Sequence, residues 1–332
     1  MADTVENTES PADSVSGLDR AFAVLLTFVA ALAVLETVVA LWAVQGARWY
    51  PVWVAVEVRV PLAVGILAIA VALRFLFSGN RFRVTAARPL GVLGIGLLLG
   101  IAYRGVVVLT ADWYETRGEY VDAVYVARLA LALLIIACGC AATALGVLAA
   151  VPRTPPARTP ISRADRLLGP LAAGAAIAAL VGSCLINIYE RLPQRDSYGL
   201  RDWYGRTGGG TVVYGMSAFE PRILGPLVFP WLVVIVLATV VLAVLLQLRF
   251  PTARSALRTG TLLLAAITLG HGSFIAISEL NAYLYQSRLP VVEVWLGPGF
   301  GTLCAATLLA VAALGTGTWA VLRPRPEPAP TG

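Results

Sequence analysis

The sequence predicts an all-α membrane protein, a polytopic bundle of eight transmembrane helices with both termini in the cytoplasm. Two observations predict this class. Of the 332 residues, 58% are hydrophobic and 13% are charged, and mean hydropathy is +0.80, whereas soluble domains carry about 25% charged residues. Apolar runs of about 20 residues recur, the length at which a helix crosses a hydrocarbon core of about 30 Å. Because these runs are continuous and not alternating, they predict helices and not barrel strands.

The expected spans follow one another with short connections. Residues 1–19 carry five acidic residues and no Arg, so they predict an acidic, disordered cytoplasmic tail and an uncleaved first span, because a signal peptide begins with a basic region. Residues 20–322 form the transmembrane domain, and the Pro-rich residues 323–332 predict a second cytoplasmic tail. The expected spans are residues 21–45, 51–77, 89–111, 124–150, 167–190, 223–248, 257–282 and 299–322.

The distribution of Arg predicts the orientation of the spans. Arg collects in the connections after spans two, four and six and again after span eight, whereas the other connections carry acidic and aromatic residues. Cytoplasmic connections concentrate basic residues, so we expect both termini inside and the longest connection, residues 191–222, outside. The predicted location is the plasma (inner) membrane of a bacterium, because a chain without Lys and rich in Ala, Val, Leu and Gly is typical of a GC-rich genome.

Composition also excludes several classes of protein. All 25 basic residues are Arg, which excludes catalysis through a Lys Schiff base. His271 is the one histidine, too few for a membrane haem or di-iron site. The four cysteines lie in apolar spans without Cys-x-x-Cys spacing, and no nucleotide-binding or nucleic-acid-binding motif occurs. We predict no cofactor, no metal and no nucleic-acid partner, and we favour a non-enzymatic function over an enzyme.

The phrase Asp-Trp-Tyr occurs twice at the outer ends of spans, at residues 112–114 and 202–204. Trp and Tyr settle at the headgroup level, so one interpretation is an interfacial anchor used twice. The other is a hairpin repeat, because Val-Glu-Val also occurs twice, at residues 56–58 and 292–294. In that repeat, spans one and two resemble seven and eight, and spans three and four weakly resemble five and six. The candidates for outer contacts are Trp113, Tyr114, Trp203 and Tyr204.

Ionisable residues within the spans point to a functional site, because a charge inside a bilayer is unfavourable unless it is paired or hydrated. They gather in the outer half of the expected bundle, while the inner half is predicted to be almost uniformly Ala, Leu, Val and Ile. Three interpretations stay open: a static ion-pair network, an outward-open polar pocket, and Arg side chains that extend to the headgroups, most credibly Arg128. Pairs could join the acids Glu36, Glu57 and Glu279 to the bases Arg59, Arg104 and Arg128. The pocket candidates are Glu36, Glu57, Arg59, Arg104, Asn187, His271 and Glu279.

His271 stands between two glycines in span seven, with Glu279 about two turns away. The sequence allows a hydrogen-bonded packing residue or a proton carrier, because histidine changes charge near neutral pH.

These features favour a transporter or permease-like component for a small or amphipathic molecule. One alternative is a membrane-embedded enzyme acting on a lipid or isoprenoid-linked substrate at the outer leaflet, with a Glu or His271 as general acid or base. The second alternative is a non-catalytic membrane partner subunit. The expected partners are the lipid bilayer, a small amphipathic ligand or another membrane subunit.

Overall fold

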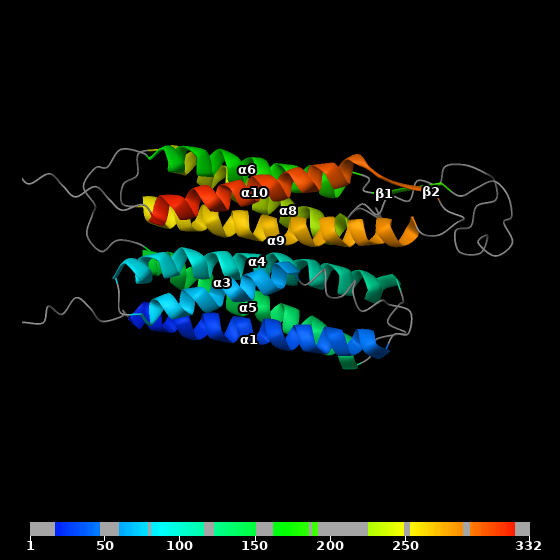
Figure 1. The fold of residues 1–332 in the computed structure, drawn as a ribbon, viewed down its shortest axis with the longest axis horizontal. Coiled ribbons are helices and arrows are strands. Elements are labelled where there is room, and N and C mark those ends of the chain that lie inside the picture. Colours follow the sequence, from blue (N-terminus) through cyan, green and yellow to red (C-terminus); the bar gives the residue numbers. More distant parts are fainter. Residues whose placement is uncertain are drawn as a thin grey trace, which may run out of the picture.

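The computed structural model describes most of the chain as helix (Figure 1). The described residues are 17–46, 60–78, 81–115, 123–150, 162–185, 188–191, 225–248, 253–287 and 293–322. The helices are α1 (Gly17–Gly46), α3 (Val60–Leu76), α4 (Arg81–Glu115), α5 (Ala123–Ala150), α6 (Arg163–Cys184), α8 (Gly225–Gln247), α9 (Arg254–Gln286) and α10 (Pro298–Leu322).

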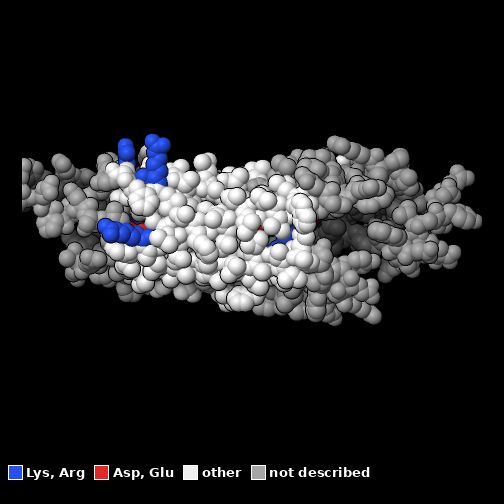
Figure 2. Space-filling model, turned by 90° about the horizontal axis from the view of Figure 1, so that it is seen from below, with Lys and Arg blue, Asp and Glu red and all other residues white. Residues whose placement is uncertain are grey.

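The architecture is that of a multi-pass membrane bundle. In the described part of the chain, α1, α4, α5, α6, α9 and α10 are long and apolar enough to cross a membrane, while α3 and α8 contribute shorter apolar stretches. Large hydrophobic side chains face outward along these helices, including Leu67 and Leu308, which are 64% and 70% exposed. Figure 2 shows the corresponding surface as a broad face with few charged side chains. Soluble proteins rarely expose so much contiguous apolar surface, so this face suits lipid.

The helices form two groups of four that lie as two layers in Figure 1. We call α1, α3, α4 and α5 the first group, and α6, α8, α9 and α10 the second group. In each group the first helix packs on the last, and the third helix also contacts the last: α1 on α5 and α4 on α5, then α6 on α10 and α9 on α10. The main contact between the groups is the single helix pair α4 and α9.

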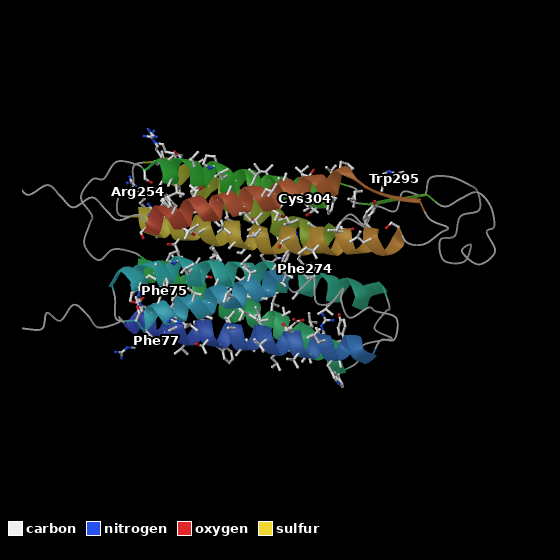
Figure 3. The ribbon with its side chains drawn as sticks, viewed as in Figure 1. Phe75, Phe77, Arg254, Phe274, Trp295 and Cys304 are labelled. Atoms are coloured by element: carbon white, nitrogen blue, oxygen red, sulfur yellow. The ribbon has the colours of Figure 1, made fainter. Side chains whose placement is uncertain are left out.

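Glycines bring α4 and α9 into close contact. A Cβ added at Gly270 of α9 would lie 2.5 Å from the carbonyl oxygen of Leu97 in α4, and one added at Gly100 of α4 would collide with the carbonyl oxygen of Ile267 in α9. Small residues allow such approach, and within lipid this packing replaces the hydrophobic effect as the force between helices. Next to this contact, Phe274 of α9 packs against the core of the first group (Figure 3).

One part of the fold differs from the all-α expectation. Ile188–Arg191 (β1) pairs antiparallel with Glu293–Leu296 (β2), with Tyr189 opposite Trp295. The fifth expected span reached residue 190, but α6 ends at Cys184. β-Branched and aromatic residues favour strands, and hydropathy alone does not distinguish a short apolar strand from the end of a helix. We call the β1–β2 pair the β-ribbon. It links the end of α6 to the start of α10, and Figure 3 shows Trp295 on it.

Two other helix starts bear on the expected spans. The second span was expected from residue 51; its described part is α3, which begins at Val60, followed by Pro61, and residues 47–59 lie outside the described residues. Proline is favoured in the first turn of a helix because it lacks the N–H that would bond to a preceding turn. The first helix begins at Gly17, inside the tail expected over residues 1–19. The hairpin repeat, which matched spans one and two with spans seven and eight, stays a prediction, because the packing of the helices does not test it.

Candidate functional site

Two ion pairs that the sequence analysis did not anticipate brace one end of the bundle. Arg88 of α4 donates from Nε and Nη2 to the carboxylate of Asp19 in α1, at 2.9 and 3.0 Å. Arg258 of α9 donates in the same bidentate way to Asp165 in α6, at 2.7 and 2.8 Å. The aspartate side chains are 3% and 1% exposed. We call this end of the molecule the clamped end; the described chain starts and finishes there (Figure 1).

Both acids lie in the first turn of their helices, α1 and α6. The backbone N–H of Asp165 donates to the hydroxyl of Ser162, which caps α6. An acid in the first turn is also favoured by the positive end of the helix dipole. The sequence analysis had placed Asp19 in a tail and Asp165 in a connection, and it expected the inner half to be plain apolar. A repeated Ser-x-x-Asp-Arg, at residues 16–20 and 162–166, was the signal that could have identified both.

A third ion pair lies toward the opposite end of the first group. Arg128 Nε of α5 is 3.5 Å from Glu36 Oε1 of α1, with side-chain exposures of 31% and 16%. This contact is longer than the bidentate pairs and Arg128 Nε makes no hydrogen bond. Glu36 is 17 residues along α1 from Asp19, which corresponds to about 25 Å. Among the three interpretations of the spans' charges, this pair fits ion pairing for Arg128 better than independent extension to headgroups.

Arg128 is also positioned by its neighbours. One turn before it, the Tyr125 hydroxyl donates to the main-chain carbonyl of Leu109 in α4. This bond joins the start of α5 to the end of α4, and α5 also packs on α1. The guanidinium therefore lies on a helix held from two sides.

His271 lies in the contact between the two groups. Its side chain is 1% exposed, and its ring is 5.7 Å from the ring of Tyr103 in α4, tilted by 44°. A Cβ at Gly100 would approach the His271 backbone nitrogen within 2.8 Å, so the histidine is tightly enclosed by α4. Glu279, two turns further along α9, is 6% exposed. Tyr103 was not among the expected site residues, although it precedes Arg104.

The candidates therefore fall into two clusters. Glu36 pairs with Arg128 between α1 and α5, whereas His271 and Glu279 lie on α9; α1 and α9 are not in extensive contact in the described part of the chain. The backbone of Arg104 lies in α4, and Trp113 and Tyr114 belong to the last turn of that helix and not to a loop, but their side chains are outside the described set. Glu57, Arg59, Asn187, Trp203 and Tyr204 lie outside the described residues.

A groove of about 510 Å³ opens between the groups, beside the α4–α9 contact. Its walls are apolar, with Leu93 and Leu97 from α4, Leu314 and Trp319 from α10, and the hydroxyl of Thr318 as a polar group. It does not include Glu36, Arg128, His271 or Glu279 among its lining residues. The polar candidates and this apolar groove are therefore separate places in the fold.

Comparison with protein-family models, with curated proteins and with solved structures gives no match.

Proposed function

We propose that the protein is a transporter or permease-like component of the plasma membrane, with both termini cytoplasmic and with a polar site for a small amphipathic molecule in the outer half of the bundle. The observation that carries this proposal is the Glu36–Arg128 pair, which lies among apolar spans with Arg128 Nε 3.5 Å from Glu36 Oε1. Charges inside a membrane commonly mark substrate or ion pathways. In this proposal the clamped end faces the cytoplasm.

The two-group architecture supports the proposal. Many transporters consist of two bundles that rock against each other around a central contact, with substrate bound near their interface. Here the groups meet mainly through α4 and α9, and each group is braced internally by its own buried ion pair. Such an arrangement favours motion between rigid groups over motion within them.

The enzyme alternative has less support. A lipid-active enzyme needs a laterally open groove with an acid or base within hydrogen-bond reach of the substrate. The groove beside α4 is lined by apolar side chains and Thr318, so it offers no carboxylate or histidine from the described residues. The partner-subunit alternative predicts that the Glu36–Arg128 pair is dry.

Thiol labelling tests the proposal directly. In a chain whose four cysteines are changed to alanine, we expect Glu36→Cys and Arg128→Cys to react with a membrane-impermeant reagent added from outside. Ala33→Cys is the matched control, because Ala33 is on the same helix and 0% exposed, and it should not react. Labelling of neither site would show that water does not reach the pair, and would favour the partner-subunit alternative.

A further inference from the structure

We infer that Arg128 binds the anionic group, a phosphate or a carboxylate, of an amphipathic molecule in the leaflet opposite the clamped end. This names the ligand class of the site proposed above and depends on that function. The main support comes from the fold. The second group resembles the first but has two glycines at the positions of Glu36 and Arg128.

The two groups correspond residue by residue at the clamped end. Asp19 with Arg88 and Asp165 with Arg258 form the same ion pair between the first and third helices of each group. Twelve residues after Arg88 comes Gly100, and twelve after Arg258 comes Gly270. These are the two glycines that meet the opposite helix at the α4–α9 contact. Because each contacts its partner reciprocally, the groups are related by an approximate twofold axis.

The last helices of the two groups can be matched in the same way. A Cβ at Gly146 of α5 would meet Phe22 and Val92, and one at Gly317 of α10 would meet Leu168 and Leu262. Phe22 and Leu168 each follow the clamp aspartate by three residues. Val92 and Leu262 each follow the clamp arginine by four. Gly146 and Gly317 are therefore equivalent positions.

Counting from these anchors places two glycines where the first group has its charges. Glu36 is 17 residues after Asp19, and the same count from Asp165 gives Gly182. Arg128 is 18 residues before Gly146, and the same count from Gly317 gives Gly299. A Cβ on Gly182 would lie 3.2 Å from the Gly299 carbonyl oxygen, so these glycines are in contact just as Glu36 and Arg128 are.

The two groups share one ion pair and differ in the other. Both groups have the Asp–Arg pair at the clamped end, so this pair belongs to the packing of the four helices. Among the described residues, the pair between the first and last helices at the opposite end belongs to the first group, and the second group joins the same two helices by direct glycine packing. The Glu36–Arg128 pair is therefore not needed to hold such helices together, and its presence in lipid calls for another role.

The geometry of Arg128 suits anion binding. A guanidinium has five N–H donors, and the described contact with Glu36 engages Nε at 3.5 Å. The clamp arginines, in contrast, each use two nitrogens at hydrogen-bond distance. At about 25 Å from the clamp along α1, the pair lies near the far edge of a hydrocarbon core of about 30 Å, where lipid headgroups begin. Arg binds phosphate and carboxylate bidentately.

Glu36 has a definite part in this site. Its carboxylate partly neutralises Arg128 when no ligand is bound, and it repels an incoming anion. Anion binding must therefore compete with Glu36. Glu36→Gln removes the competitor and should tighten binding, whereas Arg128→Gln removes the anchor. If the pair were purely structural, Glu36→Gln and Arg128→Gln would reduce probe binding equally.

The experiment uses the full chain in phosphatidylcholine nanodiscs with a short-chain fluorescent phosphatidylglycerol as the probe. We expect unlabelled phosphatidylglycerol to displace the probe and phosphatidylcholine of the same chains not to do so. Arg128→Gln should weaken binding about tenfold or more, as expected for a charge-assisted hydrogen bond, and Glu36→Gln should strengthen it severalfold. Arg74→Gln is the control, because Arg74 is an exposed arginine near the end of α3, and it should bind as the unmodified chain does. Inorganic phosphate as competitor distinguishes a free anion from a lipid headgroup.

A second variant keeps the test decisive if Arg128→Gln does not fold. Glu36→Gly with Arg128→Gly copies the second group, so it should fold and lose probe binding. Failure of this variant to fold, unchanged binding by Arg128→Gln, or equal binding of both lipids would each overturn the inference. If either lipid result is negative while Glu36→Cys is still labelled from outside, the ligand class is wrong and the proposed transport function stands.

Discussion

Asp165 and Glu36 show how one kind of residue serves two purposes in this chain. Asp165 is almost fully buried and receives two short hydrogen bonds from Arg258, whereas Glu36 is partly exposed and 3.5 Å from Arg128. Sequence reasoning identified Glu36 because it interrupts an apolar run. It missed Asp165 because an acid beside a connection resembles a solvated one, and only the contact with a residue far along the chain reveals its burial.

Loss of the clamp should cost stability. Asp165→Asn removes the counter-charge of Arg258, whose side chain is 21% exposed, and because solvent partly screens that charge the cost should be about 1–3 kcal/mol. We expect a clearly lower thermal midpoint for the purified protein. Arg163→Gln is the control, because Arg163 is exposed in the same turn of α6. Equal midpoints for the two variants would contradict a clamping role, and the exchange Asp165→Arg with Arg258→Asp should recover part of the loss.

At the scale of helices, the sequence predicted most positions but not their contacts. Apolar runs located the helical segments well because hydropathy is a local property. A helix end differed from expectation where contacts distant in the sequence determine it. The helix α6 ends at Cys184, and residues 188–191 pair with the strand Glu293–Leu296. Gly96 and Gly100 of α4 lie against α9, but their spacing in the sequence does not identify α9 as the partner helix.

The α4–α9 contact should be sensitive to added volume. Gly270→Ala places a methyl group 2.5 Å from the Leu97 carbonyl oxygen, and overpacking of this kind costs about 1–3 kcal/mol. We expect lower thermal stability of the purified protein, or a shift of the two groups relative to each other measured by distance labels. The control is Gly315→Ala on α10, where an added Cβ would meet nothing within 4 Å. A Gly270→Ala protein as stable as that control would show that the helices are not held this closely.

At the scale of the whole molecule, the Arg distribution and the apolar surface give a membrane bundle, but the twofold relation of its halves came only from the structure. The expected hairpin repeat followed the short phrases Asp-Trp-Tyr and Val-Glu-Val. The equivalence observed between the groups follows ion pairs and glycines, whose positions correspond although most neighbouring residues differ. Contacts preserve such a relation where sequence identity does not.

The β-ribbon, β1 with β2, allows the orientation of the protein in the membrane to be tested. Tyr189 and Trp295 are opposite each other in the β1–β2 pair, and directly opposed residues have Cβ atoms about 4.5–5.5 Å apart, close enough for a disulfide after small adjustment. In a cysteine-free chain, we expect Tyr189→Cys with Trp295→Cys to form a disulfide in cells, because disulfides form on the oxidising, outer side. Tyr189→Cys alone is the control. If the pair stays reduced in cells yet oxidises in purified protein, the ribbon faces the cytoplasm.

Where Gly100 and Gly270 cross, main-chain atoms of α4 and α9 fill the centre of the molecule. A continuous column of water along the twofold axis has no room there. Under the proposed transport function, a solute would therefore pass along the flank of the bundle, beside α5 or α10. That route suits a molecule whose tail stays in the bilayer while its head follows the helices, and it does not suit a hydrated inorganic ion.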